Sequence, residues 1–159
     1  GNLPYNAATA ILGRLLQLGP RVARHVLMFQ REVAHRIVAQ PGSRSYGALT
    51  VETYLTARSW MLMDIPPEAF APRPKVHSTV ILLEPRDEAL IEGEERSSFI
   101  HWVHGVFRAR RKTLERSLGC PELLRDLEID PEARPETLSP ETLLTLYRAL
   151  ADEDTGDVS

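Results

Sequence analysis

The sequence predicts an α/β domain followed by a smaller, all-helical segment. Three short apolar runs, at 25–29, 60–65 and 77–83, have the length and composition of strands. Between the first two runs, the apolar residues lie at helical spacing. Strands that alternate with helices in this way are typical of an α/β sheet buried on both faces. An acidic stretch poor in apolar residues begins at Glu84, and beyond it the spacing is helical throughout.

The first part contains three helices in addition to the strands. Asn6 is a candidate N-cap for a helix over 7–18, which Gly19-Pro20 ends. The two later helices are expected over 32–39 and, after a loop at 41–45, over 47–57. Pro66-Pro67 ends the second strand. Together these elements look like half of a sheet.

The second part is predicted to be two long helices. Phe99, Val103, Val106 and Phe107 lie at helical spacing, and this helix is expected to continue through 108–118 to Gly119. Ser139-Pro140 is a cap and first turn for a last helix. The predicted division of the chain is a sheet domain over 1–84, a linker over 85–97, a helical domain over 98–151 and a disordered acidic tail over 152–159.

Composition limits the class of protein. The 159 residues include one cysteine, Cys120, which excludes an internal disulfide and a cysteine-based metal site. The net charge of −3 is unevenly distributed: residues 1–50 hold six Arg against one Glu, and residues 120–159 hold eleven acids against three Arg. This asymmetry fits a phosphate-facing surface with an acidic far side. No apolar run is long enough to span a bilayer, and we expect a cytoplasmic protein.

The most informative phrase is Asn2-Leu3-Pro4-Tyr5, which resembles the phrase that enzymes methylating the exocyclic amine of adenine place at the mouth of their active site. The exocyclic amine of adenine is a poor nucleophile, because its lone pair is delocalised into the ring. Two acceptors, the Asn2 side-chain oxygen and the Pro4 carbonyl, can each take one N–H and leave the lone pair free to attack a methyl group. Tyr5 offers a flat face on which a base taken out of its stack can lie. Alone, the same phrase is also a reasonable strand-to-turn junction.

Several further phrases occur in one order and spacing. The chain resembles the ribosomal RNA adenine N6,N6-dimethyltransferases, in particular the bacterial small-subunit type. The matching phrases are Gly1–Asn6, Met28–Ala34, Ser45–Thr50, Phe70–Ser78, and Phe107–Leu114 with Ser117-Leu118.

This resemblance implies a fold, a cofactor and a substrate. The fold would be the C-terminal half of a Rossmann-like class I methyltransferase sheet followed by a small helical domain. The methyl donor would be S-adenosylmethionine, and the partner small-subunit rRNA or the immature small subunit. Asn2, Leu3, Pro4, Tyr5 and Phe70 would form the target-base site.

The resemblance also implies further contacts. Asn2 would also meet the methyl donor. The RNA would contact Lys75, Arg108, Arg110, Arg111 and Lys112, of which Arg108, Arg111 and Lys112 share a helix face if the helix is continuous. His77 departs from the Asp or Asn usual at its position in the family, which weakens any role for it.

The donor site itself is not visible in the sequence. The glycines form no G-x-G pattern, and the chain begins where the fourth strand of a methyltransferase sheet would end. We therefore expect a truncated chain that does not methylate RNA alone, and one that self-associates through the sheet surface left uncovered.

Other interpretations stay open. Phe70 can instead be a core residue that anchors a proline-rich turn, and the basic run near Arg108 can be a solvated helix face. The parent can be a non-catalytic RNA-binding or ribosome-assembly module. It can also be a large-subunit rRNA methyltransferase of the macrolide-resistance class.

Overall fold

The computed structural model describes the backbone of residues 1–3, 7–16, 18 and 21–156, and the side chains of these residues as far as Glu153. The chain divides into two compact units. Unit 1 consists of Gly1–Gln40 and Leu49–Leu90, and unit 2 of Pro41–Ala48 and Ile91–Ser159. The chain thus enters unit 2 twice, first as a short loop between two helices of unit 1.

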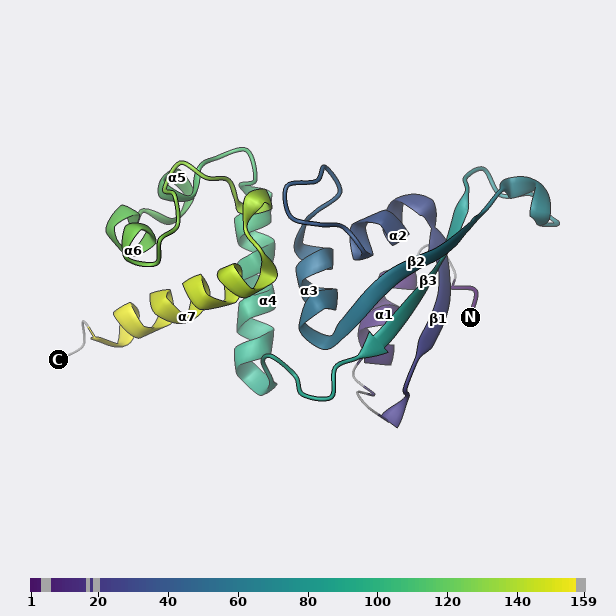
Figure 1. Ribbon diagram of the computed structural model, residues 1–159, viewed down its shortest axis with the longest axis horizontal. Helices are drawn as coiled ribbons and strands as arrows, with labels where there is room; N and C mark the ends of the chain where they lie inside the picture. Colours follow the sequence, from purple (N-terminus) through teal and green to yellow (C-terminus); the bar gives the residue numbers. More distant parts are fainter. Residues whose placement is uncertain (4–6, 17, 19–20, 157–159) are drawn as a thin grey trace. The chain divides into compact units, whose positions relative to one another are not determined.

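Unit 1 is built on a three-stranded antiparallel sheet (Figure 1). Its strands are β1 (His25–Gln30), β2 (Ala57–Ile65) and β3 (Ser78–Pro85), in the order β1-β3-β2. Residues Gly1–Leu3 lie along the other edge of β1, where Asn2 forms a parallel bridge with Met28. The three predicted strands are all present, and the N-terminal phrase runs beside one of them.

Unit 1 also contains three helices, α1 (Ala8–Leu16), α2 (Arg31–Ile37) and α3 (Ala48–Thr56). Helices α1 and α2 pack on one face of the sheet, and Leu49 of α3 packs against the same apolar cluster. Alternate strand residues face them: Leu27 and Phe29 of β1 and Ile81 and Leu83 of β3 are buried with residues of α1 and α2 in one apolar cluster. Burial also lowers the pKa of His25, at the start of β1.

The opposite face of the sheet is more open than the sequence predicted. Val26 on β1 is half exposed, which differs from the expected burial on both faces. Trp60, Met61, Leu62 and Met63 of the edge strand β2 are also 42–59% exposed, and because successive side chains alternate, this strand is open on both faces. The described helices pack on the other face, so no described helix covers Val26. At β2 the register shifts between Met61 and Met63, which is a β-bulge.

Unit 2 is helical. It contains α4 (Gly93–Arg108), α5 (Leu114–Leu118), α6 (Pro121–Asp126) and α7 (Pro140–Gly156). The structure also has 3-10 turns at η2 (Pro67–Ala69) in unit 1 and at η3 (Pro135–Thr137) in unit 2. Helix α4 begins within the stretch expected to be a linker, and α7 runs beyond the expected end at Ala151. None of the described helices is long and apolar enough to cross a membrane.

The prediction of one helix continuing through 108–118 is wrong. Helix α4 ends at Arg108, and the chain turns before α5 starts. The Thr113 side chain accepts a hydrogen bond from the Arg116 amide, 3.4 Å away, and so caps the new helix. Gly119 ends it with φ of 73°, a left-handed conformation that glycine adopts without strain. Arg108, Arg111 and Lys112 therefore do not lie on one helix face.

Aromatic residues form much of the core of unit 2. Phe99 is fully buried, and its ring centroid lies 5.2 Å from that of Tyr147. Tyr46, from the loop Pro41–Ala48, is 1% exposed and donates a hydrogen bond of 2.8 Å to the Leu138 carbonyl. Its ring meets Phe107 edge-on at 5.8 Å. Tyr46 therefore anchors the inserted loop within unit 2.

Candidate functional site

A pocket of about 380 Å³ lies in unit 1, where the N-terminal residues meet the sheet. This volume is within the range of about 300–1,000 Å³ that is usual for small-molecule sites. The strands supply one wall, and the loop between β2 and β3 supplies the other. The described residues that line it are Asn2, Leu3, Met28, Phe70, Pro72, Pro74 and Ser78.

Backbone hydrogen bonds hold Asn2 at this pocket. The Met28 amide donates to the Gly1 carbonyl at 2.9 Å, and the Leu3 amide donates to the Met28 carbonyl at 3.4 Å. Paired residues in a sheet point to the same face, so Asn2 and Met28 both face away from the helices α1 and α2. The other two residues of the predicted phrase, Pro4 and Tyr5, lie outside the described residues.

Phe70 reaches the pocket from a proline-rich loop. The loop opens with η2, and the Phe70 amide donates to the Pro67 carbonyl at 3.2 Å. The Ala71–Pro72 peptide that follows is cis. Phe70 is partly buried and lines the pocket together with Asn2, whereas the buried core of unit 1 lies on the opposite face of the sheet. The loop thus places the Phe70 ring in the same pocket as the Asn2 side-chain amide.

Four of the lining residues were not predicted from the sequence. Met28, Pro72, Pro74 and Ser78 belong to matching phrases, but no role was assigned to them. The position of Met28 follows from its pairing with Asn2, which no local pattern shows. Ser78 is the first residue of the central strand, paired with Gln30 on one side and Ile65 on the other.

The pocket is apolar apart from two side chains. Asn2 and Ser78 are the only described lining residues with polar side chains, and none carries a charge. Lys75 and His77 lie on the loop between β2 and β3 with exposed side chains, outside the lining. Because its lining is uncharged, the pocket suits a flat, uncharged group.

Near the pocket, the hydrogen bond from Thr79 holds the pKa of Asp64 below its ordinary value. Arg31, whose Nε lies 3.9 Å from Oδ2 of Asp64, lowers this pKa further.

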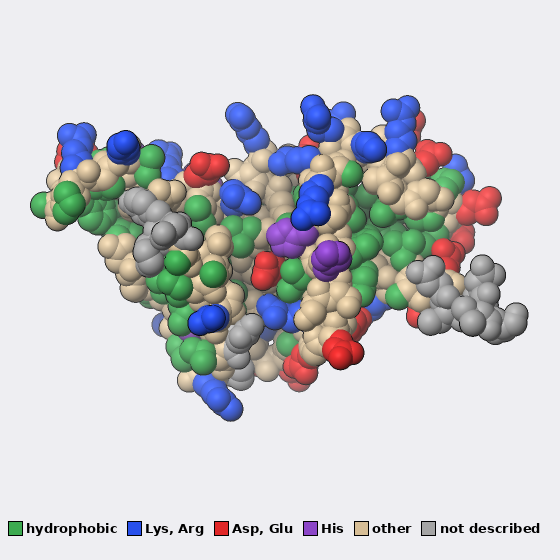
Figure 2. All heavy atoms as spheres, turned by 180° about the vertical axis from the view of Figure 1, so that it is seen from behind, with side chains coloured by type: hydrophobic (Ala, Val, Ile, Leu, Met, Phe, Trp, Pro, Cys, Tyr) green, Lys and Arg blue, Asp and Glu red, His purple; other side chains and the backbone are tan. Residues whose placement is uncertain are grey.

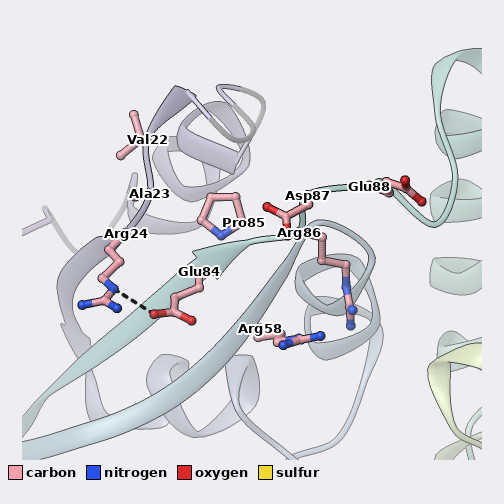
Figure 3. A pocket seen from close by; sticks show the side chains of 9 residues that line it. All are labelled: Val22, Ala23, Arg24, Arg58, Glu84, Pro85, Arg86, Asp87 and Glu88. Atoms are coloured by element: carbon pink, nitrogen blue, oxygen red, sulfur yellow. Dashed lines mark hydrogen bonds and ion pairs between the residues drawn. The ribbon is translucent and has the colours of Figure 1, made fainter.

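A second pocket lies at the other end of the sheet (Figure 3). It has a volume of about 650 Å³ and a charged lining. Arg24 donates to Glu84 at 2.9 Å, and Arg86 donates to the Tyr54 carbonyl at 2.7 Å while lying over the Tyr54 ring. Much of its charge is therefore satisfied within the protein. Its lining residues are Val22, Ala23, Arg24, Arg58, Glu84, Pro85, Arg86, Asp87 and Glu88.

The basic residues of unit 2 fall into two groups. Arg108, Arg111 and Lys112 are exposed around the turn after α4. Arg110 is instead bonded to Glu136 at 2.6 Å and to the Arg44 carbonyl at 3.4 Å, which ties the inserted loop to η3. On the face seen in Figure 2, Lys and Arg side chains project singly, with Asp and Glu among them. In the described part of the chain, no group of His, Cys, Asp and Glu is arranged to hold a metal ion.

Comparison with solved structures supports the predicted fold. The chain matches a dimethyladenosine transferase from Plasmodium falciparum with a TM-score of 0.82 and 22% identity, covering 96% of this chain and 66% of that one. The 23S rRNA methyltransferase ErmE matches with a TM-score of 0.64 and 24% identity, covering 95% and 64%. At these identities the likeness shows the fold, and the predicted fold class is confirmed.

Sequence comparison identifies the family. Residues 1–152 match the model of the ribosomal RNA adenine dimethylases. The small-subunit rRNA methyltransferases A of Nitratidesulfovibrio vulgaris and Mesorhizobium japonicum are 40% and 44% identical, over 95% and 94% of this chain. The chain spans 59% and 55% of their lengths, a little over half. As the resemblance predicted, the chain belongs to the ribosomal RNA adenine dimethylase family.

Proposed function

We propose that this chain supplies the target-base side of an enzyme that dimethylates the exocyclic amines of two adjacent adenines in small-subunit rRNA. The observation that carries the proposal is the placement of Asn2 beside Phe70 in an uncharged pocket. The names of the curated relatives point to the same substrate. An enzyme of this kind works where ribosomal subunits are assembled, which for a bacterial protein is the cytoplasm.

The chemistry assigns a role to each residue of the site. The Asn2 side-chain oxygen accepts one N–H of the adenine amine, and the Pro4 carbonyl accepts the other, which localises the lone pair on nitrogen. The Phe70 ring stacks on the extruded base, with Tyr5 as a second aromatic surface. Met28, Pro72 and Pro74 complete an apolar wall that keeps water from the amine, whereas the Leu3 side chain packs against the core on the other face of the sheet.

We further propose that the methyl donor is S-adenosylmethionine, which supplies an electrophilic methyl group on sulfur. The described pocket fits only the acceptor base, because none of its lining residues offers a carboxylate for the donor's ribose or amino group. Asn2 is the residue of this chain that would also meet the donor. The remaining donor contacts would come from the part of the relatives that this chain does not span.

RNA contacts are proposed for the exposed cations. Lys75 stands on the pocket loop, and Arg108, Arg111 and Lys112 surround the turn after α4. These side chains suit phosphate, which arginine can bind with two parallel hydrogen bonds. The bonds of Arg110 to Glu136 and Arg44 favour a structural role for it over the RNA contact that the sequence predicted.

We also propose that the isolated chain self-associates through the apolar residues that β2 exposes. Met61 and Met63 are 47% and 59% exposed. Sedimentation velocity over a range of concentrations should show species larger than a monomer, and the double substitution of Met61 and Met63 by lysine should remove them. A wild-type chain that stays monomeric at every concentration contradicts this proposal.

The function is tested by methyl transfer from labelled S-adenosylmethionine to undermethylated small subunits. The assay compares this chain with a full-length protein in which it is joined to the remainder that the relatives carry. We expect labelled dimethyladenine with the full-length protein and none with the chain alone. No transfer by a folded full-length protein that binds the subunit would favour the RNA-binding or assembly module. Transfer to large-subunit rRNA would favour the macrolide-resistance class.

A further inference from the structure

Ser78 is a buried hydroxyl that the chemistry proposed above does not use. It begins β3, and pairing with Gln30 and Ile65 fixes its backbone on both sides. Residues of this strand alternate between faces: Thr79, Ile81 and Leu83 are each 0% exposed on the helix-covered face. Ser78 therefore points to the opposite face, which it shares with Met28 and Asn2.

The Ser78 side chain is nevertheless almost completely enclosed. The residue is 1% exposed, although the face that it occupies is the open one, and it lines the pocket with Phe70 and Pro74 of the proline-rich loop. Its hydroxyl makes no hydrogen bond with another described residue. The neighbouring Thr79 hydroxyl, in contrast, donates to Asp64. Among the described residues the Ser78 hydroxyl therefore has no hydrogen-bond partner, which leaves it available to a polar group of a molecule bound in the pocket.

The chemistry of adenine supplies a partner for this hydroxyl. If the two amine hydrogens bind Asn2 and Pro4, the remaining hydrogen-bonding atoms of the base are the ring nitrogens N1, N3 and N7, which are all acceptors. Ser78 is the one hydroxyl among the described lining residues, and the others around it are Leu, Met, Phe and Pro side chains. The Ser78 hydroxyl, which lies at the sheet side of the pocket, can therefore donate a hydrogen bond to a ring nitrogen of the bound base.

We propose that Ser78 donates a hydrogen bond to a ring nitrogen of the extruded adenine and so fixes the rotation of the base within the pocket. The proposal rests on the proposed function. Asn2 and Pro4 both bind the amine, so they hold the base at one edge only and leave the opposite side of the ring without a polar contact. The hydrogen bond from Ser78 fixes the rotation of the base in its own plane, and it thereby fixes the direction in which the amine lone pair points.

The test combines a change in the protein with a change of one atom in the substrate. Ser78→Ala in the full-length protein should lower kcat/KM for methyl transfer about 5–30-fold, the usual effect of losing one hydrogen-bond donor to a bound substrate. Ser78→Cys keeps the shape of the side chain with a slightly larger atom, but a thiol donates weakly, and the variant should lose nearly as much. Ser59→Ala, on β2 outside the pocket, is the matched control and should leave the rate unchanged.

The substrate arm uses rRNA with 1-deaza-, 3-deaza- or 7-deazaadenosine at the target position. Each analogue replaces one ring nitrogen by C–H. One of them should slow the wild-type protein as much as Ser78→Ala slows transfer to adenosine, and on that analogue Ser78→Ala should cause no further loss. The slower rate on that analogue is measured with the wild-type protein, so it does not depend on how well the variant folds.

Two results overturn the proposal while leaving the proposed function in place. In the first, the wild-type protein methylates adenosine and Ser78→Ala behaves as Ser59→Ala does. In the second, Ser78→Ala causes the same loss on adenosine and on all three analogues, which is the signature of a structural role. Failure of the wild-type protein to methylate any adenine contradicts the proposed function itself.

Discussion

The two ends of the sheet in unit 1 each hold a pocket, and the two pockets differ in the charge and the hydrogen bonding of the residues that line them. At the Ser78 end the walls are apolar, and the side chains of Asn2 and Ser78 make no hydrogen bond with another described residue. At the Glu84 end the pocket is larger, but Arg24 is bonded to Glu84 and Arg86 to Tyr54 (Figure 3). Size is therefore a poor guide to function here. The charge of the lining is the better guide, because an uncharged base suits the uncharged lining around Asn2 and Ser78, whereas Arg58, Asp87 and Glu88 keep the larger pocket charged.

The largest effect is expected at Asn2. In the full-length protein, Asn2→Ala should lower kcat about 100–1,000-fold, the usual cost of losing one aligned hydrogen-bonding group that acts in the transition state. Affinity for the subunit should not change, since Asn2 contributes little to the RNA contact. Single-turnover methyl transfer and filter binding measure the two quantities. Gln40→Ala, an exposed amide in the same unit, is the control, and an equal loss of affinity and rate would contradict the assignment.

Phe70 should have the next largest effect. Phe70→Ala removes the stacking surface and should lower kcat/KM about 5–150-fold, since stacking on an aromatic ring contributes about 1–3 kcal/mol per base. Phe70→Tyr keeps the ring and should recover most of the rate. If both variants lose the same activity, the role of Phe70 is to shape the loop rather than to stack on the base.

The same contrast between free and bonded groups separates two arginines of unit 2. Arg111 is exposed, and Arg111→Ala should weaken RNA binding a few-fold and reduce the slope of log Kd against log salt by about 1. Arg110→Ala should instead lower the free energy of unfolding by about 1 kcal/mol, because it leaves Glu136 without its ion-pair partner. Salt titrations and thermal denaturation of both variants check this. A reversed pattern would return Arg110 to the RNA surface.

The smallest effect is expected at the second pocket. The Arg24 side chain is 70% exposed, so Arg24→Ala should change the free energy of unfolding by no more than about 1 kcal/mol and leave methyl transfer unchanged. Urea denaturation and the transfer assay measure the two. A tenfold loss of transfer with intact stability would show that this end of the sheet also meets the substrate, and the distinction between the pockets would fail.

Much of unit 1 was predictable because its signals are local. The short apolar runs and the helical spacing over 25–65 place strands and helices close to where they occur, and the Asn2–Tyr5 phrase led to the pocket. The break after Arg108 was missed because helical spacing of apolar residues continues past it, and the cap at Thr113 looks like any threonine in a helix. Met28 and Ser78 were missed for another reason. Their place in the pocket depends on strand register, which only the folded sheet determines.

The most direct test of the central claim replaces Phe70 by the photoreactive amino acid p-benzoylphenylalanine, which keeps an aromatic ring in the pocket. The full-length protein carrying it is irradiated on undermethylated small subunits, and the linked nucleotide is mapped. The same substitution at Trp60, an exposed aromatic residue on β2, is the control. We predict that position 70 links to the target adenines and position 60 does not. Links from position 70 only to other nucleotides would contradict the assignment of this pocket to the target base.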